Sequence, residues 1–226
     1  MTWCVYAVTG AAAGPIRTRG LRGESLTLIR VKSLAAIIGA MPRAPMPTAA
    51  NLSAYHDTLQ RLSQSRHSLL PARFGMLMSA EEIAFVLRAR GASLARALAL
   101  VRRRVQMTVR LLETGAEGQR TALVAMDPAE LVSAESGRAF LLSRATAAAR
   151  ERAVPVFDSL RPAVRRWVRA ERVERRKGVV SIYHLVPRGS ADAYRRALRV
   201  AATDVGTRVQ ISGPFPAYAF ASTLGE

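Results

Sequence analysis

The stretch Val105–Leu111, Val-Gln-Met-Thr-Val-Arg-Leu, alternates apolar with polar side chains. This period of two is typical of a strand with one face in the core and the other toward water. Beyond it the sequence predicts a helical region, a strand over 179–186, a helix capped by Ser190 and ended by Gly206, and a closing strand over 208–212. This order resembles a modified ferredoxin-like sandwich, in which helices cover one face of an antiparallel sheet.

The helical region between the first two of these strands spans about 137–177 and contains Pro155 and Pro162. Proline lacks the N–H that a helix needs and clashes with the preceding turn. We therefore expect a kink or two shorter helices rather than one continuous rod.

The first hundred residues show their own mixture of strand and helix patterns. Residues 3–8 and two segments within 25–38 are rich in β-branched and aromatic residues, while 49–66 repeats apolar residues at helical spacing. An extended segment over 69–78 precedes a helix whose start, Ser79 with Glu82, has the form of a capping box. Ser93 is predicted to cap the next helix. The fold class is thus α+β, with two domains, residues 1–103 and 104–226.

Charge is the most extreme property of the composition. The chain has 34 basic and 16 acidic residues, a formal net charge of +18. Such a charge favours acidic partners, whether nucleic acid, anionic lipid or an acidic protein surface. The densest basic run, Arg161–Lys177, is either a phosphate-binding helix or a solvated face whose arginine stems cover apolar surface.

The composition and the chain start also bear on compartment. The single cysteine, Cys4, leaves no intramolecular disulfide to form. No apolar run approaches the roughly 18 residues that span a bilayer, and the N-terminus has no basic region of a secretion signal. We expect a cytoplasmic protein without a membrane span.

Residue patterns typical of catalysis or metal binding are missing from the sequence. His56, His67 and His184 are scattered and lack the close paired spacing of metal ligands. The sequence has no phosphate-binding glycine loop, no nucleophile elbow and no zinc-protease motif. We predict no catalytic, cofactor-binding or metal-binding residues, and hence not an enzyme.

Two strings that periodicity does not explain lie far apart in the chain. The first is Leu70-Pro71-Ala72-Arg73-Phe74-Gly75, and the second is Gly213-Pro214-Phe215-Pro216-Ala217-Tyr218-Ala219-Phe220. Prolines and glycines at these densities fix extended or turning backbone.

These strings, in this order with the opening strand Val5–Val8 and with Gly137-Arg138-Ala139-Phe140-Leu141, resemble the signatures of the gas vesicle protein F/L family. The resemblance spans nearly the whole chain. It implies a two-domain α+β fold with a ferredoxin-like second domain, and no catalysis. It also implies an accessory or minor structural protein of gas vesicle assembly, which supports buoyancy, resides with the vesicle or in the cytoplasm, and binds the small hydrophobic shell protein and other accessory proteins.

The family-motif positions are the candidate site residues, as structural positions or partner contacts: Pro71, Arg73, Phe74, Gly75, Gly137, Phe140, Leu141, Gly213, Pro214, Phe215, Pro216, Tyr218 and Phe220. Arg73 is either a partner contact or a buried arginine between domains. The alternative function, which rests on charge alone, is a basic α+β nucleic-acid-binding module.

Overall fold

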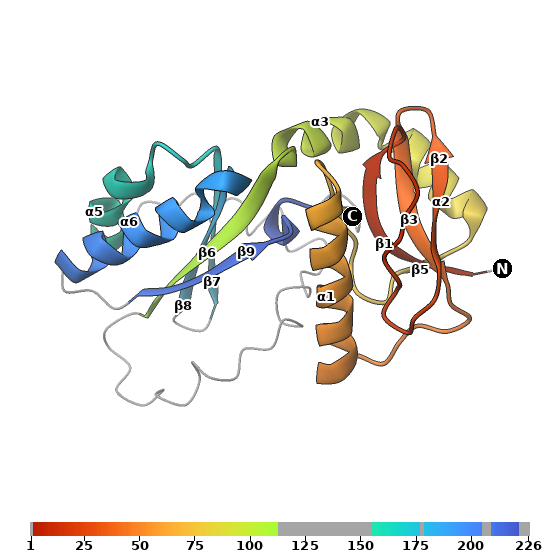
Figure 1. Ribbon diagram of the computed structural model, residues 1–226, viewed down its shortest axis with the longest axis horizontal. Coiled ribbons are helices and arrows are strands. Elements are labelled where there is room, and N and C mark those ends of the chain that lie inside the picture. The colour runs from red at the N-terminus through yellow and green to blue at the C-terminus, as the bar shows by residue number, and fades with distance from the viewer. Residues whose placement is uncertain (1, 113–154, 177–178, 205–208, 222–226) are drawn as a thin grey trace. The chain divides into compact units, whose positions relative to one another are not determined.

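A computed structural model describes residues 2–112, 155–176, 179–204 and 209–221 (Figure 1). The chain folds into two compact units, which meet in sequence at Arg103 and Arg104. The described part of the first unit comprises 2–103 and 216–221, and the remaining described residues form the second. The division near 104 lies where the sequence suggested it, but 216–221 group with the first unit, because their apolar side chains are buried there. That the units are independent domains stays a prediction.

The first unit is built on an antiparallel sheet of five strands. Their order is β2-β3-β1-β4, and β5 also pairs with β1. The bounds are β1 (Trp3–Gly10), β2 (Leu26–Val31), β3 (Leu34–Ala40), β4 (Leu70–Pro71) and β5 (Leu77–Met78). The expected strand pair within 25–38 is confirmed, with its turn at Lys32 and Ser33.

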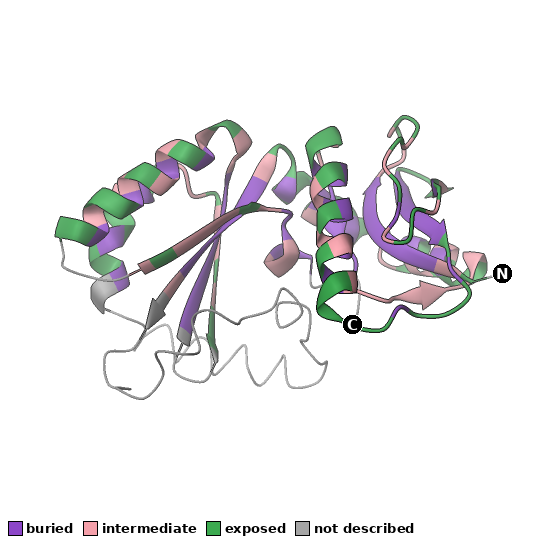
Figure 2. Cartoon of the chain, turned by 60° about the horizontal axis from the view of Figure 1, so that its bottom comes forward, coloured by how far each residue is buried: buried purple, intermediate pink, exposed green. Residues whose placement is uncertain are grey.

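Strands β1 and β3 carry continuous buried runs instead of alternating ones. Cys4 to Thr9 and Leu34 to Gly39 are all buried, which requires cover on both faces of the sheet (Figure 2). Three helices, α1 (Ala49–Ser65), α2 (Ala80–Ala89) and α3 (Gly91–Val101), pack against this sheet or its edges. Helix α1 contributes Tyr55, Leu59 and Leu62 to a core that also holds Tyr6 and Ile37.

Of the two helix starts predicted from local sequence in this unit, one is confirmed and one is not. Ser79 and Glu82 form the predicted capping box, with both reciprocal hydrogen bonds present. The predicted cap at Ser93 is wrong: α3 begins at Gly91, and its Ser93 hydroxyl donates to the carbonyl of Arg90. Arg90 alone separates α2 from α3, so Ser93 already lies within the first turn of the helix.

The second unit has a four-stranded antiparallel sheet in the order β7-β8-β6-β9. Its elements are β6 (Arg104–Leu112), α5 (Pro155–Val164), β7 (Ala170–Arg176), β8 (Val179–Pro187), α6 (Ala191–Asp204) and β9 (Val209–Phe215). Within its described residues the succession is therefore β-α-β-β-α-β, a split βαβ connectivity. The sequence predicted one strand fewer, because 170–176 fell in the expected helical region 137–177. These residues form β7 instead, a charged strand whose one β-branched residue, Val173, gave little strand signal. A short 3-10 turn, Arg188–Ser190, leads into α6, and Gly206 lies outside the described residues.

The two described helices of this unit, α5 and α6, cover the same face of the sheet. Val105, Met107 and Val109 of β6 share one core with side chains of α5 and α6, among them Leu160 and Leu198. These residues of β6 alternate along the strand, as the period of two predicted. The expectation that the other face meets water is wrong, because Gln106 and Thr108 are buried as well.

The basic run Arg161–Lys177 does not form a phosphate-binding helix. Its described part spans the end of α5, a turn and strand β7, because α5 ends at Val164. Pro155 stands at the first helical position, where no N–H is needed, and Pro162 lies in the last turns. The helical region predicted upstream of Pro155 lies outside the described residues.

Gly213 gives a direct test of this sheet. Its φ is +108°, and an added Cβ would lie 2.6 Å from the carbonyl oxygen of Gln106 on β6. We predict that Gly213→Ala lowers the free energy of unfolding by about 1–3 kcal/mol, measured by urea denaturation.

Gly91→Ala is the matched control, since Gly91 begins a helix and an added Cβ would meet no atom within 4 Å. This variant should be at least as stable as the wild type. Equal stability of the two variants would contradict the steric argument at Gly213.

Candidate interaction site

The first motif string and the end of the second, distant in sequence, pack beside helix α1 in the first unit, whereas 213–215 belong to β9 of the second unit. Residues 70–75 form β4 and the turn after it, and Tyr218–Phe220 form a 3-10 turn, η3, that contacts β4. Two neighbouring residues of α1 contact them: Tyr55 contacts the first string and His56 the second.

Tyr55 holds the first string in place. Its hydroxyl lies 3.0 Å from the carbonyl oxygen of Ala72 and 3.3 Å from that of Tyr6. The ring of Phe74 meets the Tyr55 ring edge-on, with 5.3 Å between centroids. Burial raises the pKa of Tyr55 well above its ordinary value, so the phenol stays neutral as a donor.

Tyr6 extends the same aromatic cluster across the sheet. Its ring stacks on Tyr55 with centroids 5.3 Å apart, and its hydroxyl donates to the carboxylate of Glu24. The same hydroxyl accepts from the backbone N–H of Leu21 at 2.9 Å. Burial and the hydrogen bond to Glu24 raise the pKa of Tyr6. Behind it, burial and the Glu24 charge raise the pKa of the Cys4 thiol to about 12, so no reactive thiolate forms at neutral pH.

His56 holds the second string. Its Nδ1 lies 2.8 Å from the hydroxyl of Tyr218, and the two rings stack with centroids 5.8 Å apart. Burial lowers the pKa of His56 against an opposing effect of Asp57, and burial raises the pKa of Tyr218. Both side chains are therefore uncharged at neutral pH, and Nδ1 of the imidazole can accept a hydrogen bond from the Tyr218 hydroxyl.

The motif residues divide into buried and accessible positions. Pro71, Pro216 and Phe220 are buried, whereas Phe74, Phe215 and Tyr218 are partly buried. Pro214 is exposed on β9, an edge strand, where a missing N–H is tolerated. Gly75 has φ +73° and Gly213 has φ +108°, conformations that favour glycine. Gly137, Phe140 and Leu141 lie outside the described residues.

Arg73 is exposed, so it is not the buried arginine that the sequence left open. It stands next to the half-buried ring of Phe74, at the surface of the aromatic cluster. An exposed arginine that follows the buried string and precedes a partly buried phenylalanine is suited to a protein contact. The residues at this surface can contact another molecule through apolar packing and hydrogen bonds.

The second unit contains another buried histidine pair. The imidazole of His184, on β8, lies 2.7 Å from the hydroxyl of Tyr194 through Nδ1 and 2.9 Å from Glu171 through Nε2. Glu171 also accepts from Arg161 at 3.1 Å. This chain of partners satisfies a side chain with no solvent exposure, which is what a buried polar group requires.

Sequence reasoning set aside both histidines as scattered residues. His184 did carry a signal, because it occupies an inward position of an apolar strand. His56 carried none, since its partner is 162 positions away.

Neither a membrane span nor a metal centre occurs in the described part of the chain. Among the described helices none is long and apolar enough to cross a bilayer. The described residues also hold no group of three histidine, cysteine or acidic side chains placed to bind a metal ion.

Comparisons with known proteins point in one direction. The sequence matches the family described as "Gas vesicle synthesis protein GvpL/GvpF" over residues 2–222. The fold is similar to the crystal structure of gas vesicle protein GvpF from Anabaena sp. PCC7120, with a TM-score of 0.68, 12% identity, and coverage of 97% of this chain and 98% of that one.

A second crystal structure, of GvpF from Microcystis aeruginosa, gives a TM-score of 0.71 at 12% identity, with the same shares covered. At this identity the likeness establishes the fold. A comparison with curated protein sequences gave no match.

The hydrogen bond between His56 and Tyr218 can be tested by removing the phenol oxygen. We predict that Tyr218→Phe lowers the free energy of unfolding by about 1 kcal/mol, because the ring is kept and one hydrogen bond is lost. In a His56→Leu background the same change should cost much less. An undiminished cost there would show that Tyr218 acts through another partner.

The lowered pKa of His56 predicts a pH dependence of stability. The unfolded imidazole has a pKa of about 6.5, and the folded value lies below it, so the unfolded state binds the proton more readily. The resulting stability is present above about pH 6.5 and is lost as the pH falls through the folded pKa.

Urea midpoints at neutral and mildly acidic pH measure this effect. The wild type should lose more stability on acidification than His56→Asn, because the two proteins share every other titratable group. An equal loss in both would contradict the assignment to His56.

Proposed function

Since this chain belongs to the gas vesicle synthesis protein GvpL/GvpF family, we propose that it acts in gas vesicle assembly by binding the small hydrophobic shell protein. It does so as a non-enzymatic accessory or minor structural protein, in the cytoplasm or on the vesicle. Its further partners are other accessory proteins of the vesicle.

The family match over residues 2–222 is the observation that carries this proposal. Physical chemistry makes the role reasonable. A shell subunit with a water-repelling face associates non-specifically unless a folded partner covers that face before assembly. A folded α+β protein can offer an apolar strip or a sheet edge for the purpose.

The family-motif positions support the proposal because some of them are buried and shape the fold, while others are accessible to a partner. Most of them build the aromatic cluster around Tyr55 or the edge strand β9, while Arg73 and the outer part of Phe74 are accessible. We therefore propose Arg73 and Phe74 as contact residues, and Pro71, Gly75, Gly213 and Phe220 as residues that shape the surface.

The net charge of +18 favours one alternative, a nucleic-acid-binding module. The described part of the basic run gives it less support than a single helix would. Arg161 is engaged by Asp158 and Glu171, and Arg169 donates to the carbonyl of Arg166.

A pull-down of the shell protein tests the proposal. Purified chain should retain the shell protein at about 150 mM and at about 500 mM salt, because an apolar contact survives the screening of surface charge. Loss at the higher salt, with nucleic acid bound instead, would overturn the proposal in favour of the basic module.

A further inference from the structure

An open groove of about 530 Å³ lies in the second unit, between the end of α5 and the outer face of α6. Its lining is mostly apolar and comprises Ala163, Arg166, Trp167, Ala193, Arg196, Ala197, Val200, Ala201 and Asp204. The groove is separate from the aromatic cluster of the first unit.

Helix α6 buries one apolar face, where Tyr194 and Leu198 lie against the sheet and Ala197 and Ala201 pack at the margin of the core. The groove residues of α6 recur at three and four positions, so they form a stripe along the helix beside this buried face. Val200 on this stripe is 63% exposed, an apolar side chain that the fold leaves facing water. The alanines beside it let another helix approach closely, because the distance between packed helices depends on the contact side chains.

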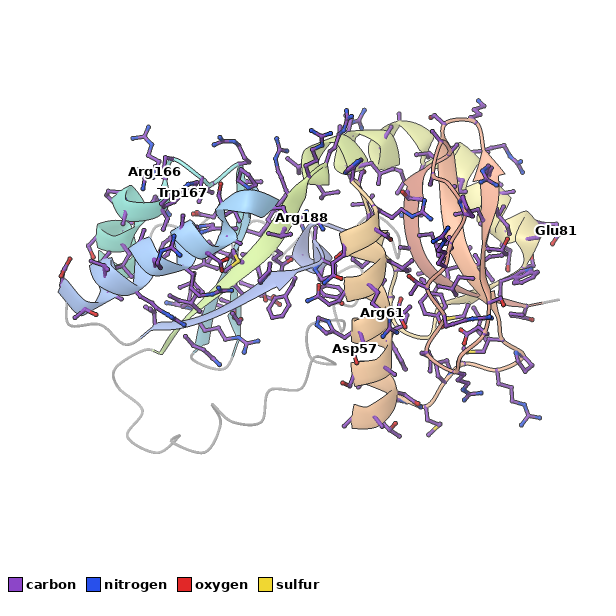
Figure 3. All side chains as sticks on the ribbon, viewed as in Figure 1. Asp57, Arg61, Glu81, Arg166, Trp167 and Arg188 are labelled. Atoms are coloured by element: carbon purple, nitrogen blue, oxygen red, sulfur yellow. The ribbon has the colours of Figure 1, made fainter. Side chains whose placement is uncertain are left out.

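Trp167 forms the wall of the groove, and Arg166 is held against it. The guanidinium carbon of Arg166 lies 4.0 Å from the centroid of the Trp167 ring (Figure 3). This stacking keeps a cation at the edge of an apolar surface. Tryptophan and arginine are the residue types that contribute most to protein interfaces.

The charges on the groove are mainly positive. Arg166 and Arg196 stand against the single carboxylate of Asp204. Within the described part of the chain, neither arginine has a carboxylate within ion-pair distance. An apolar floor with basic edges is complementary to an amphipathic helix that carries acidic residues beside its apolar stripe.

We propose that this groove is the docking site for an acidic amphipathic helix of a vesicle protein. The identification of the source as a vesicle protein rests on the proposed assembly role, whereas the preference for an acidic helix rests on the groove alone. The helix lays its apolar stripe over the alanines and Val200, against Trp167, and its carboxylates meet Arg166 and Arg196.

Two designed peptides test the helix preference. Each has about 20 residues, enough to form a helix, with the same alanine and leucine stripe but glutamate or lysine flanks. Binding is followed by Trp167 fluorescence in a Trp3→Phe background, which leaves one tryptophan. The glutamate peptide should bind at least about tenfold more tightly than the lysine peptide.

Three exposed positions of α6 provide the variants. Val200→Glu and Arg196→Glu should each weaken the glutamate peptide about tenfold, and Arg199→Glu, a matched charge reversal outside the groove lining, should leave it nearly unchanged. Helical content by circular dichroism checks that all three fold. Equal binding of both peptides would show that charge does not select the helix, and equal weakening by Arg199→Glu would show general charge attraction. Either result overturns the proposal.

Two other occupants give distinct results. Displacement of the peptide by short duplex DNA at physiological salt would assign the groove to nucleic acid. A dimer in sedimentation that Val200→Glu abolishes would assign it to a second copy of the chain. Either result overturns the acidic-helix proposal.

A shell-protein pull-down with the same variants separates this inference from the proposed function. Capture lost in Val200→Glu but kept in Arg199→Glu supports both. Capture unchanged in Val200→Glu overturns the groove as the vesicle contact and leaves the assembly role standing. Peptide binding without any shell capture overturns the assembly role and leaves the acidic-helix site.

Discussion

The contact between Tyr218 and His56 closes the first unit with the far end of the chain. It joins residues 162 positions apart, and the buried Ala217 and Phe220 accompany it. The entropy cost of closing such a loop grows only with the logarithm of its length. Burial of one phenylalanine contributes about 1.5–3 kcal/mol toward that cost.

The second unit lowers this entropy cost further. Its sheet pairs β6 with β9, so the chain leaves and re-enters the first unit at neighbouring points. Gln106, near the start of β6, lies opposite Phe215, the last residue of β9. Once these strands pair, residues 104 and 215 begin and end a unit whose ends are neighbours, as is common for inserted units. This explains why Gly213 matters: a side chain there would strike the Gln106 carbonyl in that very pairing.

A histidine pairs with a tyrosine in both units, half-buried in the first and fully buried in the second. In each, a histidine Nδ1 lies within 2.8 Å of a tyrosine hydroxyl, His56 with Tyr218 and His184 with Tyr194. The phenol adds ring burial to a hydrogen bond, and burial raises the pKa of both tyrosines, so they remain neutral. Side chains outside these pairs, such as Arg73 and Val200, are exposed to solvent.

The sequence alone determined the features that depend on near neighbours. Alternation predicted β6, helical spacing predicted α1, and the Ser79 signal predicted a capping box, because each rests on contacts within a few residues. The two motif strings indicated the family without indicating what they touch. Only the tertiary structure placed the first string and the end of the second together beside α1 and left Val200 of α6 exposed at a groove. Contacts between distant residues produce no repeating pattern in the sequence, so the sequence alone could not predict them.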